Sequence, residues 1–304
     1  MCQGGRRVKR KRYYANEDYE EIYNIDSDAF NDNQQERLEI LRNRSVSKYR
    51  VKTIRSGDML EVEAYPLFDA PTGKRGKRKN SSTAAQQNLN NKNTKKRIIR
   101  LTNANFTDDD IWSTLTYSDN NLPADPEQAK KDIQNFIRRI KRYIKKNNLQ
   151  ELKYIYVTEY NNAPGKKVRI HHHIITNFRD RDVFEDLWQG GGRSQTRRLR
   201  ADDFGLEGLV RYITKDVNET KRYSVSRNLT QPTITIADTK LTRRRAEKIA
   251  TEEVSAQEVF EKMYQGYKFN DIDVKFSDWT SGAYLYVRMK RSDVSIRGRG
   301  RKDE

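Results

Sequence analysis

The three histidines of the chain stand in a row, in the segment V-R-I-H-H-H-I-I-T at residues 168–176. The β-branched residues around them predict a β-strand, on which successive side chains alternate between the two faces. His171 and His173 therefore share one face, and two neutral imidazoles placed in this way can reach the same metal ion. His172 points to the other face, with the neighbouring isoleucines. Ordinary polar residues on a half-buried strand are the alternative, but the absence of histidine elsewhere favours a metal site.

A carboxylate is expected at the same site. The segment L-K-Y-I-Y-V-T-E-Y at 152–160 also reads as a strand, and seven polar and turn residues separate it from the histidine strand. The two segments are therefore predicted to form an antiparallel hairpin that brings Glu159 to His171 and His173. Two imidazoles and one carboxylate leave coordination positions open, as at a catalytic ion. We expect Mg²⁺ or Mn²⁺ oriented on a phosphate; the alternative for Glu159 is a solvated acid at a strand end.

A tyrosine and a lysine follow on a predicted helix. In G-L-V-R-Y-I-T-K, Tyr212 and Lys215 are three residues apart and so lie on one flank of that helix. A phenol is a weak nucleophile at neutral pH, since its reference pKa is about 10. A nearby ammonium and a metal-polarised phosphate would both favour the negative charge that develops during attack. Because the chain has 17 tyrosines, a core or surface role is the alternative.

The overall charge indicates the partner. Lys and Arg number 61 against 43 Asp and Glu, which gives a net charge of +18. A chain this basic favours a polyanion, and we expect nucleic acid rather than a membrane surface because no long apolar run is present. Hydrophobic and charged residues each make up 34% of the chain, so part of it is expected to be solvated arm or linker. The single cysteine, Cys2, excludes an internal disulfide and favours a reducing compartment.

The expected secondary structure mixes strands and helices. The helix with the strongest signal runs from about Asp125 to Lys146, with Asp125 as N-cap and an apolar stripe at helical spacing. A second helix is expected to start at Asp202 or Asp203 and run through the tyrosine segment. Further helices are predicted after residue 82, at 182–188 before a glycine run at 190–192, and in two pieces at 240–264. Strands are predicted as a pair within 49–66, at 111–117 and in the two hairpin segments, in the segment from 223, and as a closing pair at 267–276 and 283–290. This pattern predicts an α+β fold built on an antiparallel sheet with flanking helices.

Three regions are expected to lie outside the core. They are a polar N-terminal arm at 1–48, a basic linker at 70–82 and a charged C-terminal tail at 291–304. The N-terminal arm lacks the apolar run of a secretory signal. It is either a disordered end or an arm that contacts phosphates.

Three segments, in this order, resemble motifs of the HUH endonucleases, the superfamily of rolling-circle replication initiators and relaxases. T-L-T-Y-S-D at 114–119 resembles the first-strand motif, R-I-H-H-H-I-I at 169–175 the metal motif, and R-Y-I-T-K at 211–215 the nucleophile motif. The segments R-S-G-D-M-L-E-V-E-A-Y-P and Y-S-V-S-R-N-L further resemble Rep proteins of bacterial plasmids, phages and mobile elements. The resemblance covers residues 45 to 290, which suggests one HUH-type endonuclease domain at 49–290.

The resemblance implies a compact, RRM-like antiparallel palm and specific residue roles. His171, His173 and Glu159 would hold Mg²⁺ or Mn²⁺, Tyr212 would be the nucleophile of a single-tyrosine enzyme, and Lys215 its electrostatic partner. The middle residue of the metal motif is usually apolar. Here it is His172, which either packs inward or competes as a ligand.

The implied activity is metal-dependent nicking and rejoining of single-stranded origin DNA through a 5′-phosphotyrosine. The setting would be the cytoplasm of a bacterial host, with a host helicase and replication machinery as possible partners. Basic residues expected to contact phosphates are Lys141, Arg142, Arg197 and Arg198. Two alternatives stay open: an origin-recognising DNA-binding protein that does not cut, and a relaxase or single-tyrosine transposase with the same chemistry.

Overall fold

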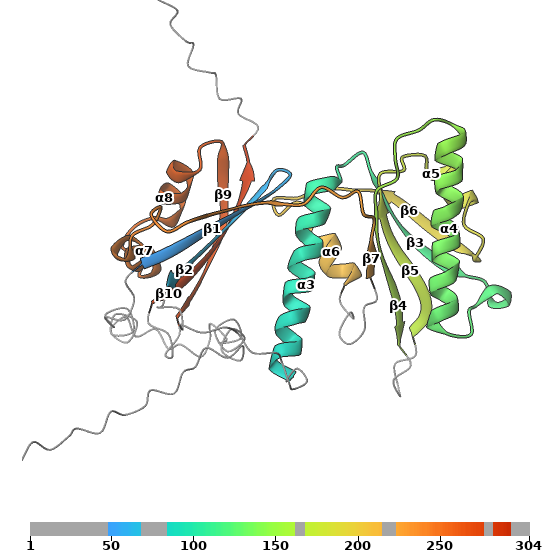
Figure 1. Cartoon of the computed structure of the whole chain (residues 1–304), viewed down its shortest axis with the longest axis horizontal. Helices are drawn as coiled ribbons and strands as arrows, with labels where there is room; N and C mark the ends of the chain where they lie inside the picture. Colours follow the sequence, from blue (N-terminus) through green and yellow to red (C-terminus); the bar gives the residue numbers. More distant parts are fainter. Residues whose placement is uncertain (1–47, 68–83, 162–167, 215–222, 277–281, 293–304) are drawn as a thin grey trace, which may run out of the picture.

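The computed structural model describes residues 48–67, 84–161, 168–214, 223–276 and 282–292. These residues form two antiparallel sheets of five strands each, with helices around them, which confirms the predicted α+β class (Figure 1). The N-terminal arm, apart from Lys48, the basic linker, Lys215 and the C-terminal tail beyond Ser292 lie outside the described residues. Among the described helices, none is long and apolar enough to cross a membrane.

We name the two sheets A and B. Sheet A has the strand order β8-β1-β2-β10-β9, and sheet B has the order β6-β3-β5-β4-β7. The strands of sheet A are β8 (Thr233–Ala237), β1 (Lys48–Ser56), β2 (Met59–Leu67), β10 (Ala283–Arg291) and β9 (Tyr267–Phe276). The strands of sheet B are β6 (Gly191–Arg198), β3 (Ile111–Tyr117), β5 (Val168–Thr176), β4 (Tyr154–Asn161) and β7 (Tyr223–Val225).

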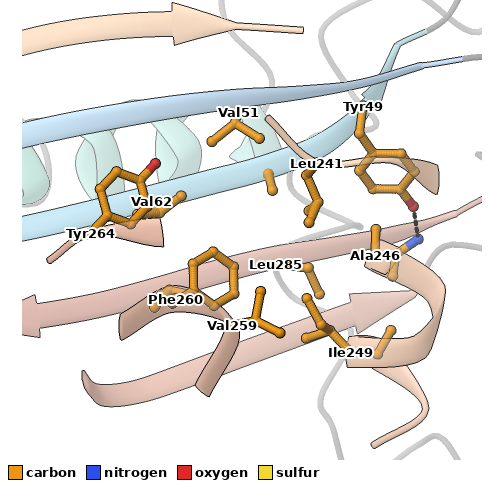
Figure 2. Packing of buried hydrophobic residues seen from close by; sticks show 14 of the residues in the cluster. Tyr49, Val51, Val62, Leu241, Ala246, Ile249, Val259, Phe260, Tyr264 and Leu285 are labelled. Carbon is orange, nitrogen blue, oxygen red and sulfur yellow. Dashed lines mark hydrogen bonds between the residues drawn. The ribbon is translucent and has the colours of Figure 1, made fainter. Parts of the chain in front are cut away.

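The helices cover chosen faces of these sheets. They are α3 (Ala84–Asn105), α4 (Pro126–Lys146), α5 (Arg181–Asp186), α6 (Glu207–Ile213), α7 (Arg243–Ala250) and α8 (Ala256–Met263). On sheet A, α7 and α8 pack onto one face, where Phe260 and Ile249 meet Val62 and Leu285 in a buried cluster (Figure 2). On sheet B, α4 covers one face through Phe136. The other face of sheet B lies under α3 and α6 (Figure 1).

Most of the expected elements are present. The strand pair within 49–66 is the β1–β2 hairpin, and the predicted N-cap is formed, since the Asp125 side chain accepts a hydrogen bond from the backbone N–H of Gln128. The two helical pieces at 240–264 and the closing strand pair are also confirmed. The sequence did not indicate that the strands divide between two sheets.

Two elements differ from the prediction. Residues 191–198 form β6, an edge strand, although G-G-R-S-Q-T-R-R carries no apolar signal. An exposed polar edge strand needs none, because it is held by backbone hydrogen bonds to β3 alone. The second helix was predicted to start at Asp202 or Asp203 but α6 begins at Glu207, because residues 202–205 form a tight turn closed by reciprocal backbone hydrogen bonds between Asp202 and Gly205.

Helix α3 connects the two sheets through two chemically different sides. Its apolar side contributes Ile98 and Leu101 to the cluster beneath sheet B. Its other side places Arg100 on sheet A, where the guanidinium donates to Glu61 at 2.7 Å and to Glu63 at 2.8 Å. All three of these charged side chains are at most 17% exposed. The contact between α3 and sheet A is therefore largely ionic and mostly removed from water.

Removing Arg100 should be costly. We expect Arg100→Ala to lower the free energy of unfolding by about 3 kcal/mol, because it leaves two buried carboxylates without their common partner. Urea unfolding followed by circular dichroism measures this. Arg97→Ala is the matched control, since Arg97 is exposed on the same helix and should change stability by less than about 0.5 kcal/mol. Equal stability of the two variants would contradict a structural role for the ionic contact.

Candidate metal centre

The β4–β5 hairpin brings the expected ligands together. In its register Glu159 stands directly opposite His171, and Val157 stands opposite His173. Because side chains alternate along a strand, all of these residues face the side of sheet B that lies under α3 and α6. The hairpin predicted from the sequence is confirmed, and so is the shared face of the two histidines.

The three side chains converge on one point. The Nε2 atoms of His171 and His173 are 3.2 Å apart, and the Glu159 Oε2 atom lies 3.4 Å from the first and 3.3 Å from the second. Three ligand atoms with these separations match one side of an ion held at about 2.0 to 2.1 Å. His173 and Glu159 are buried, whereas His171 is partly exposed, so the group is open on one side. This donor set fits a divalent ion with further positions available to a substrate.

Each imidazole is oriented by a partner on its other nitrogen. His171 Nδ1 lies 2.9 Å from the backbone carbonyl of Arg169, which can only accept a hydrogen bond. The proton of neutral His171 is therefore on Nδ1, and the lone pair of Nε2 points towards the other two ligands. His173 Nδ1 lies 3.1 Å from the Thr114 hydroxyl on the neighbouring strand β3. Such outer partners are typical of metal-binding histidines.

Thr114 offers a test of this arrangement that does not depend on catalysis. We expect Thr114→Val to weaken Mn²⁺ binding by about tenfold or more, because it removes the hydroxyl that orients His173. Isothermal titration calorimetry of the whole protein with Mn²⁺ measures the affinity. Thr116→Val is the matched control on the same strand, since the Thr116 hydroxyl donates to the Arg193 carbonyl instead. Unchanged affinity in Thr114→Val would show that this contact does not support a metal site.

His172 lies on the other face of the sheet and is fully buried. Its Nε2 atom is 2.7 Å from the Tyr117 hydroxyl and its Nδ1 atom is 2.9 Å from the Thr158 hydroxyl. Burial, with the two neighbouring histidines, lowers the pKa of His172 to about 3, so the ring is neutral. Of the two possibilities left by the sequence, inward packing is the one observed: both ring nitrogens of His172 bind core hydroxyls.

Tyr212 lies next to the three ligands. Its ring centroid is 5.7 Å from that of His173, and the phenol side chain is 52% exposed although α6 is otherwise anchored in the core. The buried residues of α6, Val210 and Ile213, hold the helix against sheet B. The described part of the chain thus places an accessible phenol at the rim of the metal group. Lys215 lies outside the described residues.

Trp112 is a site residue that the sequence did not reveal. Its ring lies 6.3 Å from that of Tyr212 in an edge-on arrangement and 6.5 Å from that of His173. Trp112 alternates with Thr114 on β3, so the two residues share the metal face. The sequence signal was this alternation within I-W-S-T-L-T-Y, but it gains meaning only once β3 is known to pair with β5.

The four basic residues expected to bind phosphates lie in different places. Arg197 stands opposite Trp112 on the edge strand β6 and is exposed, so it shares the metal face. Arg198 is turned to the other face, where its guanidinium donates to the Asp109 carbonyl. Lys141 and Arg142 are exposed on α4, which covers the face of sheet B opposite to the metal group (Figure 1). Only Arg197 lies on the metal face.

One comparison with known proteins covers this region. Residues 110–222 match a family model described as Replication-associated protein ORF2. The matched segment begins just before β3 and contains the metal group and Tyr212, as well as Lys215. Over this segment the chain is similar to replication-associated proteins, which supports a replication initiator role and interaction with DNA. No curated protein and no solved structure matches the chain.

Proposed function

We propose that the protein is an HUH-type single-strand DNA endonuclease that initiates rolling-circle replication. The observation that carries this proposal is the exposed phenol of Tyr212 beside Glu159, His171 and His173, within a segment similar to replication-associated proteins. We propose residues 49–290 as the endonuclease domain. The proposal sets the reaction in the cytoplasm of a bacterial host, where a helicase and a polymerase would act on the nicked strand.

The metal group would bind the scissile phosphate. Glu159, His171 and His173 would hold Mg²⁺ or Mn²⁺, which when bound supplies a Lewis acid that polarises a phosphoryl oxygen. The carboxylate keeps the site closer to neutral than two imidazoles alone would. Thr114 and the Arg169 carbonyl fix the two imidazole rings, so the ligands need little rearrangement when substrate arrives.

Tyr212 would be the nucleophile. Its phenol oxygen forms a bond to phosphorus as the bond from phosphorus to the 3′ oxygen breaks, and the phenol proton is passed overall to the departing 3′ oxygen. The products are a 5′-phosphotyrosine and a free 3′-hydroxyl, which is the primer for replication. Since the phosphotyrosine conserves the energy of the broken bond, attack by a 3′-hydroxyl reverses the step and rejoins the strand. Lys215 is proposed to stabilise the developing charge.

The DNA strand is proposed to cross the open side of the metal group. Arg197, on the same face, would contact a phosphate beside the scissile one, and the ring of Trp112 would support the phenol of Tyr212. Lys141, Arg142 and Arg198 would then contact phosphates farther from the cut. These contacts predict an affinity for DNA that falls steeply as salt is raised.

A nicking assay tests the proposal. Single strands tiled over the replicon that encodes the protein would be labelled at the 5′ or 3′ end and incubated with Mn²⁺, Mg²⁺ or EDTA. We expect one strand to give a metal-dependent, SDS-resistant complex that retains only the 3′-end label, with a released 5′ fragment ending in a hydroxyl. Tight binding without any adduct would favour the non-cutting DNA-binding alternative. A relaxase or a transposase would also form the adduct, so the role in replication needs a plasmid-replication assay.

A further inference from the structure

A pocket of about 380 Å³ lies at the end of strand β3, apart from the metal group. It is formed between the loop that follows β3, the first three turns of α4, and residues 188–190. Neither Tyr212 nor any residue of the metal group lines it. Tyr117 does, and the hydroxyl of Tyr117 binds His172. Because His172 stands between two metal-group residues on β5, the pocket lies at the same end of sheet B as the metal group, on the opposite face.

One wall of the pocket is a polar stripe on α4. Gln128, Asp132, Asn135 and Arg139 are spaced four, three and four residues apart, so they lie on the same side of the helix. Gln128 donates to the Asp132 carboxylate at 2.8 Å, and Arg139 Nε donates to the Leu187 carbonyl at 2.9 Å. These contacts fix the carboxylate and the guanidinium before any ligand arrives. A carboxylate has about four acceptor positions and a guanidinium five donors, so both keep capacity for a ligand.

The other walls combine aromatic and aliphatic side chains with glycine. Trp188 and Tyr117 contact each other edge-on, and Leu122 at the mouth is 42% exposed. Gly191 has φ +70°, and a Cβ there would lie 2.6 Å from the Asn121 side chain. The glycine is therefore required for residues 188–192 to pack against the loop after β3. The pocket is a fixed part of the fold with one flat apolar side and one polar side.

The chemistry of the walls indicates the class of ligand. One carboxylate and one guanidinium leave no net charge, and a phosphate would be repelled by Asp132. A flat, neutral molecule with polar edges fits better, and among the parts of a DNA strand this is a base. Guanine alone combines adjacent N–H donors, which a carboxylate accepts, with the O6 and N7 acceptors that a guanidinium binds.

We propose that this pocket binds a guanine base of the DNA strand, with Asp132 accepting from its N–H edge and Arg139 donating to its acceptors. The inference rests on the proposed function in one respect, namely that the protein binds single-stranded DNA. The base would belong to a nucleotide near the scissile phosphate, since the pocket and the metal group share one end of the sheet. The pocket would thus contribute to the choice of the nick site.

Binding of short oligonucleotides tests the inference. The probes are fluorescent oligothymidylates of about 12 nucleotides in which the central base is T, G, A, C or hypoxanthine, which lacks the 2-amino group of guanine. Fluorescence anisotropy in EDTA measures affinity for the whole protein. We expect the G probe to bind about tenfold more tightly than the others, in line with one bidentate base contact. Asp132→Asn should bring the G probe to the affinity of the T probe and leave the T probe unchanged.

Controls separate base recognition from damage to the fold. Glu127→Gln removes a carboxylate from the same helix outside the pocket and should keep the full preference for G. Asn135→Ala, at an exposed position of the stripe, should reduce the preference and serves as a second variant if Asp132→Asn does not fold. The proposal is overturned if wild-type protein binds all five probes within about twofold, if it prefers another base, or if the preference survives in Asp132→Asn.

The same assay separates this inference from the proposed function. EDTA prevents nicking, so base preference is measured without the metal or the nucleophile. A protein that nicks an origin strand but shows no Asp132-dependent preference retains the proposed function and loses the guanine pocket. A protein that shows the preference but never forms an adduct retains the pocket and loses the endonuclease.

Discussion

Tyr212→Phe is expected to abolish the covalent complex with origin DNA, with a loss of nicking of at least about 10⁴-fold. The change removes only the phenol oxygen, and the ring can keep its edge-on contacts with Trp112 and His173. Because the lost atom is the one that forms the bond to phosphorus, no neighbouring group can substitute for it at the same position. Adduct formation is measured on denaturing gels with labelled single strands and Mn²⁺.

Two measurements make this result specific. Binding of the uncut strand should be nearly unchanged in Tyr212→Phe, because the phenol oxygen is not expected to contribute to ground-state affinity. Tyr143→Phe is the matched control, since Tyr143 lies on α4 against the opposite face of the sheet and should form the adduct at the wild-type rate. An adduct that persists in Tyr212→Phe would keep the chemistry and assign the nucleophile to another residue.

Glu159→Gln is expected to lower the nicking rate by at least about 100-fold at limiting metal. Replacing outer partners of metal ligands typically costs about 10- to 100-fold in affinity or activity, and a direct ligand should cost at least as much. The amide keeps the size of the side chain but loses the charge that balances the ion. Raising Mn²⁺ should restore part of the rate, because the two histidines remain.

Metal binding can also be followed without DNA. A ligand that binds only the folded protein stabilises it, so Mn²⁺ should raise the melting temperature of the wild type and much less that of Glu159→Gln. Glu151→Gln, at an exposed position before β4, should respond like the wild type. If Mn²⁺ raises the melting temperature of Glu159→Gln as much as that of the wild type, Glu159 is not a ligand.

The sequence predicted the metal group well because strand alternation is a local rule. Once 152–160 and 168–176 were identified as a hairpin, the positions of Glu159, His171 and His173 on one face followed. His172 was harder, since an imidazole can bind either a metal or buried hydroxyls. The Tyr117 and Thr158 hydroxyls that decide the matter come from two different strands.

Features that depend on long-range pairing could not be predicted in the same way. Strand β6 has no apolar pattern, and Trp112 joins the site only because β3 pairs with β5. The division into two sheets is also not local, because β1 and β2 pair with β8 and β10, which lie far along the chain. The Arg100 contacts with Glu61 and Glu63 follow from that division.

The most direct test of the account is to identify the residue that carries the DNA. The covalent complex formed with Mn²⁺ would be digested with nuclease and trypsin, and the remaining nucleotide-linked peptide sequenced by mass spectrometry. The account predicts that the nucleotide is attached to the tyrosine of the peptide Tyr212-Ile213-Thr214-Lys215. Attachment to any other residue would contradict the assignment of Tyr212 as nucleophile and with it the proposed geometry of attack beside the metal group.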